Sequence, residues 1–137
     1  WDDNPRSTPS ILLNNFYEGI DGNIHIRDLN EANFTNCIIY GNLSTEVSFQ
    51  KQEGGIFNYF FDHSLIRIDP TINIDNLHFN NVIINQNPAF IDVSKSNSDF
   101  HLENISPAID AGNNSIMMSD LDGYPRSNPD LGVYEFH

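Results

Sequence analysis

The chain has 137 residues, with 19 acidic and 6 basic side chains and a formal net charge of −13. Nucleic acids and anionic membrane surfaces are bound through clustered Lys and Arg, so this balance argues against both as partners. No apolar run approaches the roughly 18 residues of a transmembrane helix, and we expect none. Hydrophobic residues make up 39% of the chain and aromatic residues 12%, which predicts one domain with a packed core.

The composition favours short strands joined by tight bends. Asn accounts for about one residue in seven, and Ile is almost as frequent. Asn tolerates the left-handed conformation of turns, whereas Ile favours strands. Cys37 is the only cysteine, which excludes a disulfide within the chain.

The first expected elements are two strands over residues 11–17 and 23–27, joined by a turn at Asp21-Gly22. A six-residue pattern then occurs three times: Phe, a polar residue, Asn or His, a small residue and two large aliphatic residues. Its copies start 27 and then 18 residues apart and span residues 34–39, 61–66 and 79–84. A constant pattern with a loop of variable length is typical of a solenoid, in which each coil matches its neighbour only along the stacked strands.

The third position of each copy predicts a bend. The two consecutive aliphatic residues break strict alternation, and a bend would let residues on both of its sides point inward. Stacked copies would then place three side chains above one another in a hydrogen-bonded ladder: Asn36, His63 and Asn81. We therefore predict an all-β chain folded as a right-handed parallel β-helix, with a β-sandwich as the alternative.

The chain changes character after the third copy. Residues 106–137 are rich in turns, and a solenoid end must be covered. We expect residues 1–105 to form β-helix coils and residues 106–137 an irregular C-terminal cap of the same domain. On its own, the first coil would expose strand edges and apolar core, so it would need a partner chain, self-association or a cap made from residues 1–15.

Three closing motifs carry a resemblance to a known family. They are Ser106 to Gly112 (SPAIDAG), Asp120 to Arg126 (DLDGYPR) and Pro129 to Glu135 (PDLGVYE). In this order they resemble the C-terminal end of exported right-handed β-helix proteins of the pectin-lyase-like superfamily. Such proteins are common in Bacteroidetes and often bear a "choice-of-anchor" label. Tyr124 and Val133 stand where the family often has Asn and Ala.

The resemblance implies location more than chemistry. It implies a longer protein with a signal or lipoprotein leader and further N-terminal coils, exported to the cell surface, outer membrane or periplasm. For this chain it implies a non-catalytic scaffold whose expected partner is an extracellular glycan. One alternative is the tail of a polysaccharide lyase or glycoside hydrolase whose active site lies on N-terminal coils, and another is an adhesin-like stalk without a small ligand.

No catalytic residue is predicted within the chain. Asp62-His63-Ser64 contains the residue types of a hydrolytic triad, but consecutive residues of a strand point to opposite faces and should not converge. The carboxylates that could act as a hydrolase pair, Asp62, Asp69 and Asp92, form no compact motif.

Two further groups are assigned structural roles. Asp120 and Asp122 open a calcium-like loop, but Arg126 follows where such a loop needs an acid. We therefore expect a structural turn, with a calcium site as the alternative, and no other cofactor. Arg126 is expected to pair with Asp130 or Glu135 and fix the cap. The predicted cap residues are Asp110, Arg126, Asp130 and Glu135.

Overall fold

The computed structural model describes residues 6–114 and 119–137, which form strands, turns and no helix. The predicted all-β class is therefore confirmed for this part of the chain. Among the described residues there is no helix, and hence no helix long and apolar enough to cross a membrane. The strands are β1 (Ile11–Asn14), β2 (Phe16–Glu18), β3 (Ile24–Ile26), β4 (Asn33–Thr35), β5 (Ile38–Ile39), β6 (Val47–Gln50), β7 (Phe60–Ile66), β8 (Phe79–Ile84), β9 (Phe90–Asp92) and β10 (Asp99–Leu102).

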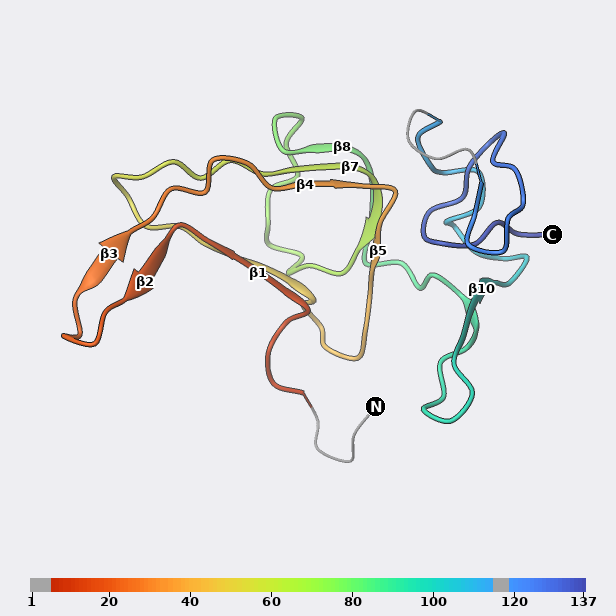
Figure 1. The fold of residues 1–137 in the computed structure, drawn as a ribbon, viewed down its shortest axis with the longest axis horizontal. Coiled ribbons are helices and arrows are strands. Elements are labelled where there is room, and N and C mark those ends of the chain that lie inside the picture. Colours follow the sequence, from red (N-terminus) through yellow and green to blue (C-terminus); the bar gives the residue numbers. More distant parts are fainter. Residues whose placement is uncertain (1–5, 115–118) are drawn as a thin grey trace.

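The three copies of the repeated pattern lie side by side in one parallel sheet. β7 pairs with β4 and β5 on one edge and with β8 on the other. The register aligns Phe34 with Phe61 and Phe61 with Phe79. Figure 1 shows β4, β7 and β8 running together before the chain turns down along β5. The strands are short, and none of the four sheets in the described part of the chain closes on itself.

A bend occurs at the third position of every copy. Asn36, His63 and Asn81 have φ values of 54°, 42° and 49°, in the left-handed region that most residues avoid. Asn and His are among the residues that accept this conformation best. Since the three bends occur at equivalent positions, the stacked strands turn the same corner together.

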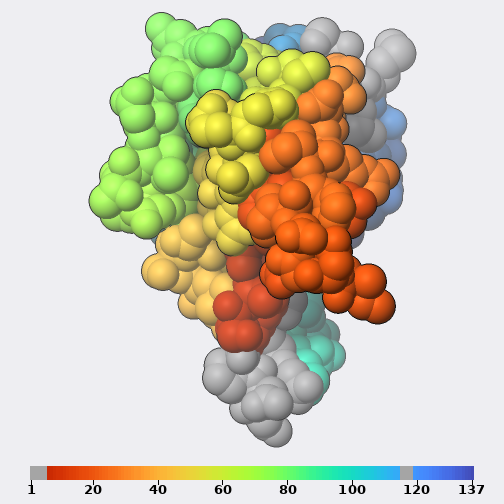
Figure 2. All heavy atoms as spheres, turned by 90° about the vertical axis from the view of Figure 1, so that its left-hand side faces the viewer, coloured from red at the N-terminus to blue at the C-terminus, as the bar shows by residue number. Residues whose placement is uncertain are grey.

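The remaining strands form either further parallel pairs or antiparallel hairpins. β1 pairs with β6 in parallel, and an isolated parallel bridge joins Val47 to Ile68. Two antiparallel hairpins, β2–β3 and β9–β10, branch away from the parallel sheet. The β2–β3 hairpin projects to one side in Figure 1 and protrudes from the surface in Figure 2.

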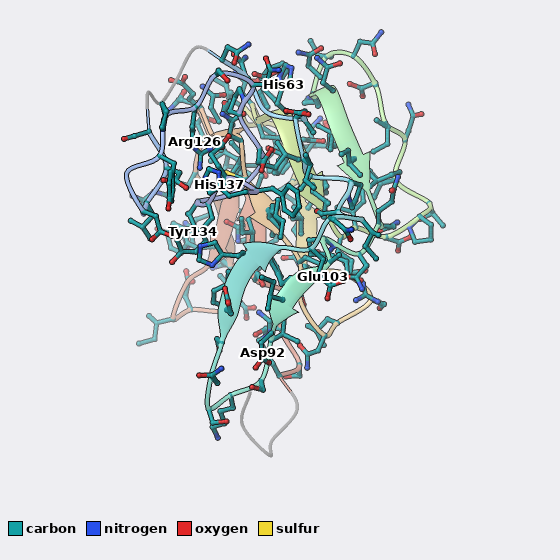
Figure 3. All side chains as sticks on the ribbon, turned by 90° about the vertical axis from the view of Figure 1, so that its right-hand side faces the viewer. His63, Asp92, Glu103, Arg126, Tyr134 and His137 are labelled. Atoms are coloured by element: carbon teal, nitrogen blue, oxygen red, sulfur yellow. The ribbon has the colours of Figure 1, made fainter. Side chains whose placement is uncertain are left out.

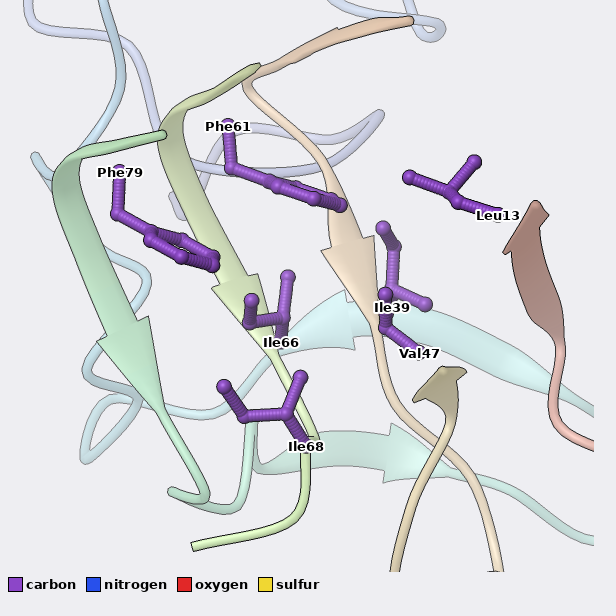
Figure 4. Packing of buried hydrophobic residues seen from close by; sticks show 7 residues of the cluster. All are labelled: Leu13, Ile39, Val47, Phe61, Ile66, Ile68 and Phe79. Atoms are coloured by element: carbon purple, nitrogen blue, oxygen red, sulfur yellow. The ribbon is translucent and has the colours of Figure 1, made fainter. Parts of the chain in front are cut away.

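One apolar cluster lies on the inner side of the bends. Phe61 is fully buried and stacks on Phe34 and Phe79, with ring centroids 4.6 and 5.7 Å apart. Ile66 and Val47 complete the centre of this cluster (Figure 4). Residues on both sides of each bend reach it, as the sequence predicts, because the bend resets the phase of side-chain alternation.

The paired aliphatic residues behave differently from the prediction. Ile66 lies in the inner cluster, but the residue before it, Leu65, packs in a second cluster with Ile38 and Ile83. Alternation is therefore broken at the bend itself and holds after it, so only one residue of each aliphatic pair lies in the inner cluster. The pairs are apolar because the sheet is covered on both faces, as is usual for parallel strands.

The C-terminal segment covers the outer face of the sheet. Leu102, Ala108 and Leu131 are buried against Leu65 in the second cluster. Figure 1 accordingly shows residues after about 105 beside β5 and β7. The contacts of residues 106–114 and 119–137 with the sheet are thus lateral, whereas the sequence led us to expect a cover over the last coil.

Candidate functional site

A polar cluster surrounds the bend of β7. Asp62 Oδ1 lies 2.8 Å from His63 Nδ1, so these neighbours do converge, contrary to the prediction. The left-handed backbone of His63 turns its ring toward the preceding side chain instead of away from it. Both side chains are largely buried, with 13% of Asp62 and 21% of His63 exposed.

Asparagines from other segments complete this cluster. Asn80 and Asn113 donate from Nδ2 to the two carboxylate oxygens of Asp62, at 2.7 and 2.8 Å. Burial alone would raise the pKa of Asp62, but these donors and His63 outweigh it and lower the pKa. The carboxylate is therefore held ionised as an acceptor.

The predicted ladder is joined at one of its two steps by side chains. Asn81 Nδ2 lies 2.9 Å from His63 Nε2, which fits a ring that donates from Nδ1 to Asp62. Asn36 instead holds the backbone of Asn113: its Oδ1 accepts from the N–H at 2.6 Å, and its Nδ2 donates to the carbonyl at 3.0 Å. The polar row thus ties the C-terminal segment to the bends.

Ser64 does not face this cluster. It is fully buried, and its hydroxyl donates to the Asp62 carbonyl at 3.0 Å and accepts from the Cys37 N–H at 3.2 Å. Since both ring nitrogens of His63 also have partners, no described proton path joins the histidine to the serine. The Asp62-His63-Ser64 run has the composition of a triad without its geometry.

A second cluster, which the sequence reasoning missed, joins β10 to the C-terminal segment. His101 Nδ1 lies 2.6 Å from Asp99, its Nε2 lies 2.9 Å from Asp122, and its ring stacks on Tyr134 at 3.9 Å. The hydrogen bonds from Asp99 and Asp122 raise the pKa of His101. The contact of His101 with Asp99 could have been predicted, because residues two apart on a strand lie on the same face. No pattern near His101 in the sequence indicates its contacts with Asp122 and Tyr134.

The two calcium candidates serve separate purposes. Asp120 is buried, and its carboxylate accepts the N–H groups of Tyr124 and Glu135 at 2.7 and 3.0 Å. Asp122 faces His101 instead. Within the ranges 6–114 and 119–137, no three His, Cys, Asp or Glu side chains gather as metal ligands would.

Three of the four predicted cap residues, Arg126, Asp130 and Glu135, have buried side chains that form a network, whereas the exposed Asp110 joins it through its backbone N–H alone. Arg126 donates to the carbonyls of Asp130 and Gly132 at 3.1 and 3.0 Å. Its Nε lies 3.3 Å from Glu135 Oε1, an ion-pair distance without hydrogen-bond alignment. The structure therefore places Arg126 against the Glu135 carboxylate and against the backbone, rather than the side chain, of Asp130.

Asp130 ties the rest of this network together. Its carboxylate accepts the N–H groups of Asp110 and Phe136 at 2.7 and 2.6 Å. Glu135 Oε1 accepts the Asp130 N–H at 3.0 Å. Burial raises the pKa of Glu135, and the neighbouring Asp130 carboxylate adds to that rise.

An apolar hollow of about 520 Å³ runs along the free edge of β4 and β5. Phe34, Cys37 and Ile39 line it from the strands, Ile11 from β1, and Leu131 from the C-terminal segment. Arg126 is the one charged residue among the described lining residues, and it is held by Glu135. Such a lining suits apolar side chains rather than a charged sugar.

Two of the candidate hydrolase carboxylates, Asp62 and Asp92, do not share a cleft. Figure 3 shows His63 and Asp92 at opposite ends of the molecule, so the candidate carboxylates Asp62 and Asp92 lie far apart.

Comparisons with family models, curated proteins and solved structures found no match to the chain.

Proposed function

We propose that this chain is a non-catalytic scaffold made of parallel β-helix coils, belonging to an exported or cell-surface protein. The observation that carries the proposal is the in-register stack of Phe34, Phe61 and Phe79, with left-handed bends at equivalent positions of β4–β5, β7 and β8. A repeated corner of this kind is what a solenoid requires of every coil.

The second row of parallel pairs supports the same architecture. β1, β6 and Ile68 follow one another in parallel register just as β4, β7 and β8 do. The chain therefore returns to each row at successive passes.

The chemistry of the polar clusters favours a structural role. Asp62 and His63 have their hydrogen-bonding atoms engaged by Asn80, Asn81 and Asn113. A general base must instead have an open position for a substrate proton. The net charge of −13 also disfavours binding of acidic polysaccharides, because like charges repel, so a glycan ligand would be a neutral one.

Turnover and binding assays test this proposal. The chain should release no product from polygalacturonate or alginate, and any binding on a glycan array should fall on neutral sugars. Substrate turnover by the wild type that is lost in Asp62→Asn would contradict the scaffold proposal. Arg27→Ala, which changes an exposed residue, provides the matched control for surface effects.

A further inference from the structure

The two ends of the parallel sheet expose strand edges. Among the described residues, β4 and β5 pair only with β7, and β8 pairs only with β7. One edge therefore belongs to the first copy of the repeated pattern and the other to the third. The C-terminal segment packs mainly on a face of the sheet and reaches the first edge at the bend, where the Gly132 N–H donates to the Asn36 carbonyl at 2.9 Å. No strand of the described residues pairs with either edge.

Neither edge carries the groups that normally prevent strand addition. Edge strands are usually protected by charged residues or Pro. Residues 32–45 and 76–87 contain no Asp, Glu, Lys, Arg or Pro, although the whole chain has 19 acidic residues. The interior strand β7, by contrast, contains Asp62. Two such edges can approach each other with little of the repulsion expected between copies of an acidic protein.

The two edges also match each other in sequence. Phe79, Asn81 and Val82 of β8 correspond to Phe34, Asn36 and Cys37 at the other end. Within the molecule, the same pattern stacks in parallel register from β4 to β7 and from β7 to β8. The hollow beside β4 and β5 provides apolar space for the side chains of one more strand.

We propose that the chain assembles head to tail, with β8 of one copy pairing in parallel register with the β4–β5 edge of a second copy. This inference rests on the coil architecture proposed above. Phe79 would continue the aromatic stack on Phe34, and Asn81 would lie over Asn36. The contact joins two different surfaces, so it leaves one free edge at each end and builds open-ended assemblies.

Edge-blocking variants test the polarity of the contact. Asn36 N–H donates to the Asp62 carbonyl, so the Thr35 N–H, one residue earlier, points away from β7. Asn85 N–H donates to the Ile66 carbonyl, so the Ile84 N–H likewise points away. Thr35→Pro and Ile84→Pro therefore remove an outward donor while leaving the hydrogen bonds to β7 in place.

Mass should be measured by light scattering and sedimentation across a concentration series. The wild type should grow in average mass with concentration. Each blocked variant should remain a monomer alone, and an equimolar mixture should form dimers only. Ile20→Ser, which removes a fully exposed apolar side chain from the β2–β3 turn, should associate like the wild type.

Covalent trapping gives an independent readout. The proposed register places Val82 of one copy beside Cys37 of the next, so oxidised Val82→Cys should form disulfide-linked oligomers, and these should disappear in the added Cys37→Ser background. A wild-type protein that stays monomeric would overturn the proposal. A folded Thr35→Pro variant that still self-associates would also overturn it, because that result indicates pairing of β8 with β8. Neither result affects the turnover test, so failure of the assembly and failure of the scaffold are distinguishable.

Discussion

The network around Arg126 makes a strong prediction about stability. The side chain is 1% exposed, lies 3.3 Å from the Glu135 carboxylate and donates to two backbone carbonyls. Arg126→Ala removes the cation and leaves the Glu135 carboxylate, which is 9% exposed, without a counterion. The carbonyls of Asp130 and Gly132 lose their donor as well.

The cost follows from what is left buried. Removing one partner of a buried ion pair destabilises a protein by about 3–5 kcal/mol. For a domain of this size, each kcal/mol lowers the melting temperature by about 3–5 °C. Arg126→Ala should therefore lower the melting temperature by about 9–25 °C. The expected value is at the lower end, because burial already raises the pKa of Glu135 and protonation relieves part of the charge.

Thermal unfolding followed by circular dichroism measures this effect. Arg27→Ala should change the free energy of unfolding by less than about 0.5 kcal/mol, since Arg27 is exposed. Arg126→Ala combined with Glu135→Gln should recover part of the loss, because no uncompensated charge then remains. An Arg126→Ala protein that melts with the wild type would refute the role assigned to this network.

Three other predictions concern the aromatic stack, the bends and the histidine cluster. Phe61→Ala should destabilise the protein by about 3–5 kcal/mol in denaturant unfolding, because the ring is fully buried between two others; a loss below 1 kcal/mol would contradict the packing. Asn81→Gly should be tolerated while Asn81→Val should cost about 1–2 kcal/mol, since φ is 49° there, and equal stabilities would argue against the left-handed bend. The hydrogen bonds from Asp99 and Asp122 raise the pKa of His101 above 6.5, so its stabilising effect is complete below pH 6.5 and is lost as the pH rises through the raised pKa. A His101→Gln variant should lose that part of the pH dependence of the melting temperature, and an unchanged profile would contradict the assignment.

The repeated pattern predicts the core of the fold because each copy determines its own strand and bend from neighbouring residues. Each copy specifies a Phe, a bend residue and alternating apolar positions, and the stack follows from aligning the copies. The pattern does not reveal that Leu65 and Ile66 face different clusters. The opposite directions follow from strand alternation, but the cover over Leu65 comes from the C-terminal segment, through members of the same cluster such as Leu131 that no local pattern specifies.

The polar sites likewise include contacts that the sequence predicts and contacts that only the folded chain creates. Pairing of Arg126 with Glu135 could be anticipated because few cations are available to the closing motifs. The convergence of Asp62 and His63 could not be obtained from strand geometry, since the left-handed bend changes where the ring points. The contact of His101 with Asp122 joins residues 21 positions apart, and only the folded chain brings them together.

A designed disulfide tests the central claim, the parallel register of β4–β5, β7 and β8. Cys37 and Ser64 occupy equivalent positions on adjacent strands, and the Cys37 N–H donates to the Ser64 hydroxyl at 3.2 Å. Adjacent strands lie about 4.8 Å apart, within the span of a disulfide. Burial raises the pKa of the Cys37 thiol, so oxidation should be carried out at alkaline pH.

Oxidised Ser64→Cys, at high dilution, should lose both free thiols while remaining a single chain, as shown by thiol titration and intact mass. Val82→Cys is the matched control, because position 82 pairs with Ser64 and lies a further strand away from Cys37. It should form no disulfide within one chain. A folded Ser64→Cys protein that keeps both thiols, or an intramolecular bond in Val82→Cys, would contradict the proposed stack.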